Sequence, residues 1–322
     1  MSIQRSIVLI VGPLVLMAGF YLLTFYGVQE GKASSSAVRL SAPEMFNNPT
    51  LIKATEPDTS LQLECEAQAE SLKLRISLHL NVLVKAPYVL MGDYETETLE
   101  ALHRKTILPI QHALSISYFD THPDRPITII TLSSQERYQQ VAFELDQRKT
   151  GSYYGYFQSD EMRIVLNLAT GSGTLGHELT HALAQTDYPA MPEWFDEGLA
   201  SLHEECEFSA EGNQLLGTAN WRAQLLLSAL DRELLPELNS LVQQTRISKK
   251  QEGLTYAYAR YFCLYLQQKK LLSPFYRKLR TNQESDQTGM RTLQQLLNVN
   301  HLFEVDADFQ KWLSEFRRNS NQ

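Results

Sequence analysis

The sequence contains few cysteines and no cysteine motif. Its 322 residues include only Cys65, Cys206 and Cys263, which lie far apart and form no CxxC pair. Zinc knuckles and disulfide-rich scaffolds both need closely spaced cysteines, so neither class is indicated. One disulfide with one cysteine left over stays open, and we interpret Cys206 as an ordinary thiol.

The sequence also lacks a dense cluster of lysine and arginine. Lysine and arginine together number 29 against 37 acidic residues, and the formal net charge is −8. Proteins that bind nucleic acid neutralise phosphates with clustered basic side chains, so we expect no nucleic-acid partner. Apolar residues at 43% and charged residues at 20% are ordinary for a globular chain of one large domain or two small ones.

A long apolar run occurs at the N-terminus. Ser6 to Val28 contains no charged residue and, at about 23 residues, is long enough to cross a bilayer as a helix. Aromatic residues gather near its outer end, as they do at a membrane interface. We predict an uncleaved transmembrane anchor over residues 1–28. The alternative is a signal peptide that is cleaved near Ser35–Ala37.

The orientation of this anchor is not decided by basic residues. Arg5 precedes the apolar run, whereas Lys32 and Arg39 follow it. Because the preceding tail is so short, we place it inside and the bulk of the chain on the extracytoplasmic side. Residues 29–60 are rich in Ser, Ala, Pro, Asn and Thr and predict a flexible linker, which leaves 61–322 for the folded domain.

The first half of this domain is predicted to be rich in strands. Apolar and polar side chains alternate from Leu72 to Val84, which is the pattern of a strand with one buried face. A hairpin is expected to turn near Ser159 and Asp160. Further strands are expected at 88–94, 126–132 and 162–168, and helices at 95–119 and from a cap at Ser133 or Ser134 onward.

The second half of the domain is predicted to be helical. Everything after Pro192 has helical character, with turns near Gly212, Gly253 and Pro274. Strands early and helices late give the α+β class, with a strand-rich N-terminal lobe followed by a mostly helical lobe. The helix at the junction of the lobes is expected to be capped by Thr174.

This junction helix carries the sequence HELTH at 177–181. Four residues are about 400° of helix rotation, so His177 and His181 project from one face. Both imidazoles can then reach a single cation at about 2.0–2.1 Å. Glu178 is turned about 100° from His177, where it lies beside the metal and can accept a proton from water.

A catalytic zinc centre needs a third protein ligand. In the following segment Glu193 and Glu197 share one helix face at four-residue spacing, while Asp196 is expected to point elsewhere. Spacing alone does not choose between the two glutamates. The small residues Gly198 and Ala200 would allow two helices to cross closely.

The segments HELTH and EWFDEGLA resemble the gluzincin branch of the zinc metallopeptidases, within the peptidase-MA-like superfamily. There, a glutamate in a W-x-x-E-G-x-A-like motif is the third ligand. The resemblance implies a zincin-like fold, with Zn²⁺ bound by His177, His181 and Glu197, and Glu178 as the general base. Weaker likeness of the flanking segments, in the usual order, extends over about Leu72–Arg317.

The resemblance also implies how a substrate would be held. Tyr256, in YAYARY, matches the tyrosine that stabilises the oxyanion, and Tyr258 is the second candidate. The strand MRIVLNL (162–168) is expected to be the edge strand that binds substrate by strand addition. Many gluzincins have an aspartate four residues after the ligand glutamate, which orients a ligand histidine. Here that residue is Ser201, so another group must orient the histidine or the ligands are held less firmly.

Other residues near these motifs are expected to be structural. Most of the tyrosines between 256 and 265 would form an aromatic packing face, and Tyr153, Tyr154 and Tyr156 would pack in the hairpin rather than line a substrate cleft. His203 lies about 240° around the helix from Glu197, so we expect it to be exposed to solvent.

The sequence therefore predicts a membrane-anchored zinc metallopeptidase that hydrolyses a peptide or protein substrate. The alternative is a non-hydrolytic binding or scaffold module at the membrane surface. An intramembrane protease is excluded, because the HELTH helix has too short an apolar run and acidic neighbours. The oligomeric state is not defined by the sequence.

Overall fold

The computed structural model describes residues 59–151, 154–244, 247 and 252–320. All of them belong to the second of two units of the chain, Ala37–Gln322. The predicted anchor at 1–28 and nearly all of the predicted linker at 29–60 lie outside the described residues. Within the described part of the chain, no helix is long and apolar enough to cross a membrane.

The first half of the unit is built on a five-stranded sheet with the order β1-β2-β3-β5-β4. The strands are β1 (Asn81–Lys85), β2 (Tyr88–Gly92), β3 (Ile127–Leu132), β4 (Gly155–Gln158) and β5 (Arg163–Asn167). The three central strands run parallel, whereas β1 and β4 pair antiparallel at the two edges. Central strands buried on both faces read as continuous apolar runs, as ITIITL in β3 does.

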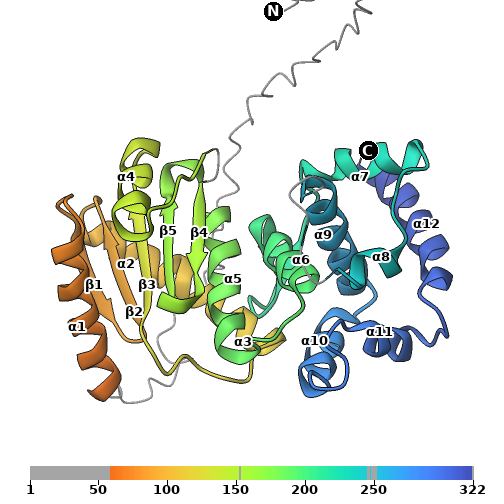
Figure 1. Ribbon diagram of the computed structural model, residues 1–322, viewed down its shortest axis with the longest axis horizontal. Helices are drawn as coiled ribbons and strands as arrows, with labels where there is room; N and C mark the ends of the chain where they lie inside the picture. The colour runs from red at the N-terminus through yellow and green to blue at the C-terminus, as the bar shows by residue number, and fades with distance from the viewer. Residues whose placement is uncertain (1–58, 152–153, 245–246, 248–251, 321–322) are drawn as a thin grey trace, which may run out of the picture. The chain divides into compact units, whose positions relative to one another are not determined.

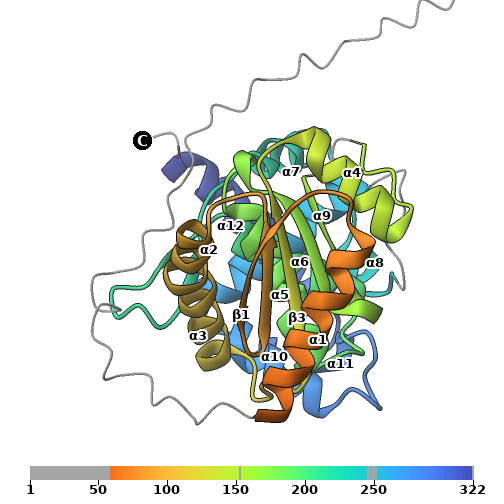
Figure 2. The same ribbon diagram turned by 90° about the vertical axis from the view of Figure 1, so that its left-hand side faces the viewer.

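Helices cover both faces of the sheet. One face carries α1 (Thr59–Arg75) and α4 (Gln135–Asp146), and the other carries α2 (Thr96–Leu102), α3 (Leu108–Ser117) and α5 (Gly173–Asp187). Figure 2 shows α1 and α4 on one side of the strands and α2 and α3 on the other. Successive residues of each strand face opposite sides of the sheet. In β2, Val89 and Met91 pack with α1 and α4, whereas Leu90 packs with α2 and α3.

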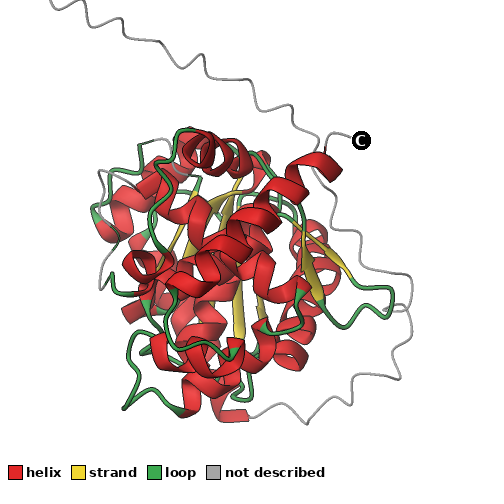
Figure 3. Ribbon diagram, turned by 90° about the vertical axis from the view of Figure 1, so that its right-hand side faces the viewer, coloured by secondary structure: helices red, strands yellow, loops and turns green. Residues whose placement is uncertain are grey.

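The second half is almost entirely helical (Figures 1 and 3). Its elements are α6 (Glu193–Glu204), a small hairpin of β6 (Cys206–Phe208) and β7 (Leu215–Gly217), α7 (Arg222–Asp231), α8 (Leu238–Val242), α9 (Glu252–Gln268), α10 (Leu272–Thr281), α11 (Met290–Leu297) and α12 (Phe303–Ser320). Helix α9 packs against α6, α7 and α10 and is mostly buried. The predicted α+β class is confirmed.

The prediction of one strand over Leu72–Val84 is wrong in its first part. Helix α1 continues to Arg75, and β1 begins only at Asn81. Cys65, Ala69, Leu72 and Ile76 are all buried against the sheet, and their spacing of four, three and four residues is that of one helix face. Leu74, which completes the apparent alternation, is 90% exposed. The alternation of apolar and polar residues at the start of this segment is therefore accidental, because that part of the segment is helical.

The other elements of the first half follow the prediction closely. Strands β2 and β3 form where expected, and the β4–β5 hairpin turns through Ser159–Glu161. The predicted helix at 95–119 is divided by a π-helical turn between α2 and α3. Of the two possible caps for α4, Ser134 accepts the Arg137 backbone N–H, while Ser133 donates its hydroxyl hydrogen to Asp93.

The predicted cap at Thr174 is wrong. Helix α5 already begins at Gly173 after Ser172, whose side chain makes no capping hydrogen bond. A Cβ added to Gly155 of β4 would lie 2.5 Å from Cγ2 of Thr174. Thr174 is thus a packing residue between α5 and the edge strand. Pro274 lies in the first turn of α10, and the turn predicted near it falls just before that helix. Gly253 lies in the first turn of α9, and the residues immediately before that helix lie outside the described part of the chain.

Candidate metal centre

The positions of α5, α6 and α9 depend on small residues where the helices cross. A Cβ added to Gly176 of α5 would lie 2.8 Å from the His203 carbonyl oxygen of α6. A Cβ added to Gly198 of α6 would lie 2.9 Å from the Ala259 carbonyl oxygen of α9 and 2.9 Å from Cys263 Sγ. Larger side chains would force these helices apart. The prediction that Gly198 permits a close crossing is confirmed, and α9 is the partner.

This crossing brings together two histidines from α5 and a glutamate from α6. The Nε2 atoms of His177 and His181 are 3.1 Å apart, and each lies 3.6 Å from Glu197 Oε2. A tetrahedral centre with metal–ligand distances of about 2.0–2.2 Å has ligand atoms about 3.3–3.6 Å apart. Among the described residues, these three form the group of His, Cys, Asp and Glu side chains that could hold a metal ion.

The chemistry of Glu197 also fits a bound cation. Its Oε2 is buried and makes no hydrogen bond within the described residues. Burial raises the pKa of the Glu197 carboxyl, but His181 and His177 lower it by more, so the pKa lies well below its usual value. An ionised carboxylate that is buried without a hydrogen bond needs a positive charge beside it.

The structure distinguishes the two glutamates that the sequence left open. Glu193 accepts a hydrogen bond from the backbone N–H of Ile247 at 3.0 Å and is not part of the metal-ligand group. Glu197 lies one helical turn later and is the glutamate that meets the two histidines. Residue spacing could not separate them because both lie on one helix face.

Asp196 has a position that the sequence analysis missed. It was expected to point elsewhere, but its Oδ1 lies 2.9 Å from Nδ1 of His181, so that prediction is wrong. Helix α6 crosses α5 at an angle at which neighbouring residues 196 and 197 contact the two ring nitrogens of His181. When Nδ1 carries the hydrogen, the lone pair of Nε2 points toward Glu197 and His177.

The two carboxylates also control the charge of His181. Burial lowers the pKa of His181, but Asp196 and Glu197 raise it by more, so the pKa lies well above its usual value. The surroundings of these rings therefore favour a positive charge. That charge can be a proton or a metal ion, and three converging ligand atoms favour a metal.

Ser201 and His203 lie behind the ligands rather than at the surface. The prediction that His203 is solvent-exposed is wrong, since it is fully buried, with its Nδ1 3.2 Å from Thr180 Oγ1. Burial and the nearby charge of Arg260 lower the pKa of His203 to about 3, so the ring is neutral at pH 7. Ser201, four residues after Glu197, is also buried, and its Oγ has no hydrogen-bond partner among the described residues.

Glu178 and Tyr256 border the three-residue group. The Glu178 side chain is buried, which raises its pKa above the usual value. Tyr256 comes from α9, and the pKa of its hydroxyl is raised by burial and by the nearby Glu197 carboxylate. The second candidate, Tyr258, instead stacks on Phe309 at 5.3 Å between ring centroids, as expected of a packing residue.

The expected edge strand is not at the edge. The segment MRIVLNL forms β5, which lies between β3 and β4, so the prediction that it is the edge strand is wrong. The edge beside α5 is β4, which is antiparallel to β5. The order of β4 and β5 along the chain does not show which of the two pairs with β3. In the structure β5 pairs with β3, and β4 lies outside β5 at the sheet edge.

The tyrosines of the hairpin have different surroundings. Tyr156 is buried, and its hydroxyl donates to Asp146 Oδ2 at 2.5 Å, which fits the predicted packing role. Tyr154, just before β4, is 52% exposed, so the prediction that it packs in the hairpin is wrong. Tyr153 lies outside the described residues.

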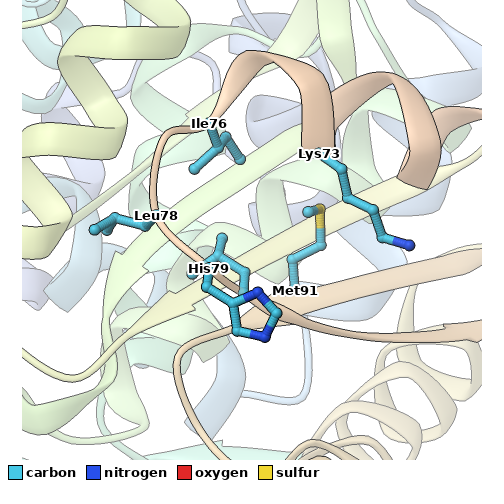
Figure 4. Close-up of a pocket in the computed structure, with 6 residues that line it drawn as sticks. Lys73, Ile76, Leu78, His79 and Met91 are labelled. Carbon is cyan, nitrogen blue, oxygen red and sulfur yellow. The ribbon is translucent and has the colours of Figure 1, made fainter.

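A separate cavity of about 280 Å³ lies on the other face of the sheet (Figure 4). It is lined by Lys73, Ile76, Leu78, His79, Leu80 and Met91. These residues come from α1, the segment before β1, and β2, whereas α5 packs on the opposite face. The cavity is therefore not part of the metal centre.

Comparison of the chain with protein-family models gives no match, and comparison with curated protein sequences gives none either. The functional argument therefore depends on the geometry around His177, His181 and Glu197.

Proposed function

We propose that the protein is a zinc-dependent metallopeptidase of gluzincin type with a zincin-like fold. The observation that carries the proposal is the meeting of HELTH with Glu197 from the next helix, at distances suited to one tetrahedral ion. Two imidazoles and one carboxylate leave a fourth position open, as catalytic zinc sites do. The order of a sheet lobe, the HELTH helix and a helical lobe agrees with this fold.

His177, His181 and Glu197 would hold the zinc ion. Zinc bound there supplies Lewis-acid chemistry, which polarises a carbonyl group and lowers the pKa of water toward about 7. Asp196 keeps His181 in the tautomer and orientation that ligation needs. In the gluzincins an aspartate at the position of Ser201 often orients a ligand histidine. We propose that Asp196 has this orienting role here.

Glu178 is proposed as the general base. It accepts a proton from the attacking water and later delivers that proton to the leaving amine. A carboxyl group whose pKa is raised by burial is better suited to both steps, because its pKa moves toward neutral pH.

Tyr256 is proposed to donate a hydrogen bond to the oxyanion that develops on the substrate carbonyl. Burial and the nearby Glu197 carboxylate raise the pKa of the Tyr256 hydroxyl, so it stays protonated beside the ligand group.

A peptide substrate is proposed to bind as an added strand along β4. This strand pairs with β5 on one side only among the described strands, so its other side can receive a peptide backbone. Strand β4 also contacts α5, which carries Glu178. A peptide bound along β4 would therefore lie beside the helix that carries Glu178 and the two ligand histidines.

The proposal includes an N-terminal anchor over residues 1–28, with the metallopeptidase unit on the extracytoplasmic side. Protease added to intact cells should then digest the unit without lysis. Full protection would reject this orientation. The non-hydrolytic alternative started from Ser201, and against it we note that Asp196 offers His181 the carboxylate that Ser201 does not.

The test compares metal content and activity of the full-length protein with two variants. Wild type should contain about one zinc per chain and cleave casein or a generic peptide mixture. Glu178→Gln should keep the zinc and lose hydrolysis, whereas His181→Ala should lose the zinc. Turnover by Glu178→Gln would reject the general base, and a zinc-free, inactive wild type would reject the proposed function.

A further inference from the structure

The loop between α4 and β4 holds a basic side chain over the edge strand. The Arg148 guanidinium carbon lies 4.4 Å from the centre of the Tyr156 ring in β4. The backbone around it is ordered by the end of α4, where Gln147 has a positive φ of 52° and the N–H of Arg148 donates to the Ala142 carbonyl. Stacking on an aromatic face holds a guanidinium group flat and leaves its edge free for hydrogen bonds.

The carboxylates closest to Arg148 along the loop and hairpin are already paired. Asp146 accepts the Tyr156 hydroxyl hydrogen at 2.5 Å and also forms an ion pair with Arg163. Arg163 forms a second ion pair with Glu161 at 3.2 Å. Arg148 itself is exposed and, within the described part of the chain, has no carboxylate within 4.0 Å. Its charge is therefore available to a ligand.

Arg148 and the proposed general base lie on opposite faces of the edge strand β4. Tyr156, which carries Arg148, packs on the side of α4, whereas the preceding residue, Gly155, packs directly on Thr174 of α5. A peptide added along β4 has side chains on both faces, so one of them can reach Arg148. Thr174 lies four residues before Glu178, so the two residues share one face of α5.

We propose that Arg148 binds a carboxylate of a peptide substrate that lies along β4. The inference rests on the proposed function and adds a substrate class to it. A guanidinium edge matches a carboxylate with two parallel hydrogen bonds. The substrate carboxylate is either an acidic side chain or the C-terminus.

The experiment measures kcat/KM of the full-length protein in detergent with matched peptides. One set exchanges glutamate for glutamine at each position beside the scissile bond, and another exchanges a free C-terminus for an amide. The variants are Arg148→Gln and Arg148→Glu. The matched control is Lys149→Gln, which removes an exposed basic residue that follows Arg148 in the same loop.

Wild type should prefer the carboxylate member of one peptide pair about tenfold or more, the ratio expected for a hydrogen-bonded charge pair. The set that shows the preference identifies an acidic side chain or a C-terminus. In Arg148→Gln the ratio should fall to about one, and in Arg148→Glu it should drop below one. In Lys149→Gln the ratio should stay within about twofold of wild type.

Three results would overturn the inference. In the first, the protein cleaves peptides without any carboxylate preference, or with one that persists in Arg148→Gln; the proposed function then survives alone. In the second, no peptide is cleaved at all, and the proposed function fails together with the inference. Equal losses of preference in Arg148→Gln and Lys149→Gln would show an effect of net charge and would also reject a role specific to Arg148.

Discussion

Replacing Asp196 with alanine removes the hydrogen bond that orients His181. The bond joins Asp196 Oδ1 and His181 Nδ1 at 2.9 Å. Hydrogen bonds to charged groups contribute about 1.5–3 kcal/mol. Because the Asp196 side chain is 33% exposed, solvent screens the interaction and the lower part of this range applies. A loss of about 1.5–2 kcal/mol weakens zinc binding about 10- to 30-fold.

The assay is a competition for zinc between the full-length protein and a coloured chelator at pH 7. Asp196→Asn keeps an oxygen that can accept the hydrogen bond, so its affinity should fall by only about threefold. Glu193→Ala is the control, because this acidic residue of the same helix accepts a hydrogen bond from the Ile247 backbone and is not part of the metal-ligand group. Its zinc affinity should stay within about twofold of wild type. Unchanged affinity in a folded Asp196→Ala protein would refute the orienting role.

The other predictions concern catalysis and stability. Tyr256→Phe should lower kcat about 100- to 1,000-fold while zinc content stays the same, and wild-type turnover in this variant would exclude the oxyanion role. Gly198→Ala places a Cβ 2.9 Å from the Ala259 carbonyl oxygen, so the free energy of unfolding should fall by about 1–3 kcal/mol in a denaturant titration. An unchanged midpoint would show that the helices can move apart at no cost. Burial raises the pKa of Asp187, but hydrogen bonds from Tyr276 and Arg280 lower it by more, to below the usual 3.8. Its stabilising contribution is therefore complete above pH 3.8 and is lost as the pH falls through the lowered pKa. Asp187→Asn should flatten the fall of Tm on the acid side, and an identical profile in wild type and variant would count against this interaction.

The sequence predicted the parts of the centre that depend on helix periodicity alone. His177 and His181 share a face because four residues are about one helical turn, whatever surrounds the helix. Strands β2, β3 and β5 were predictable because they are buried on both faces and read as apolar runs. Glu197 was separated from Glu193 only by the family resemblance.

The parts that were predicted wrongly depend on tertiary packing. Asp196 reaches His181 because of the angle between α5 and α6, which no local pattern encodes. His203 is buried because α6 is enclosed between α5 and α9, so a polar residue there does not mark a solvent face. The position of β4 at the sheet edge depends on strand order rather than on sequence order.

The most direct test of the account is the position of zinc in crystals of the full-length protein, found by anomalous scattering at the zinc edge. The account predicts one strong peak within about 2.0–2.2 Å of Nε2 of His177, Nε2 of His181 and a carboxylate oxygen of Glu197. A peak elsewhere in the folded unit, or a zinc ion that Glu197 does not contact, would contradict it.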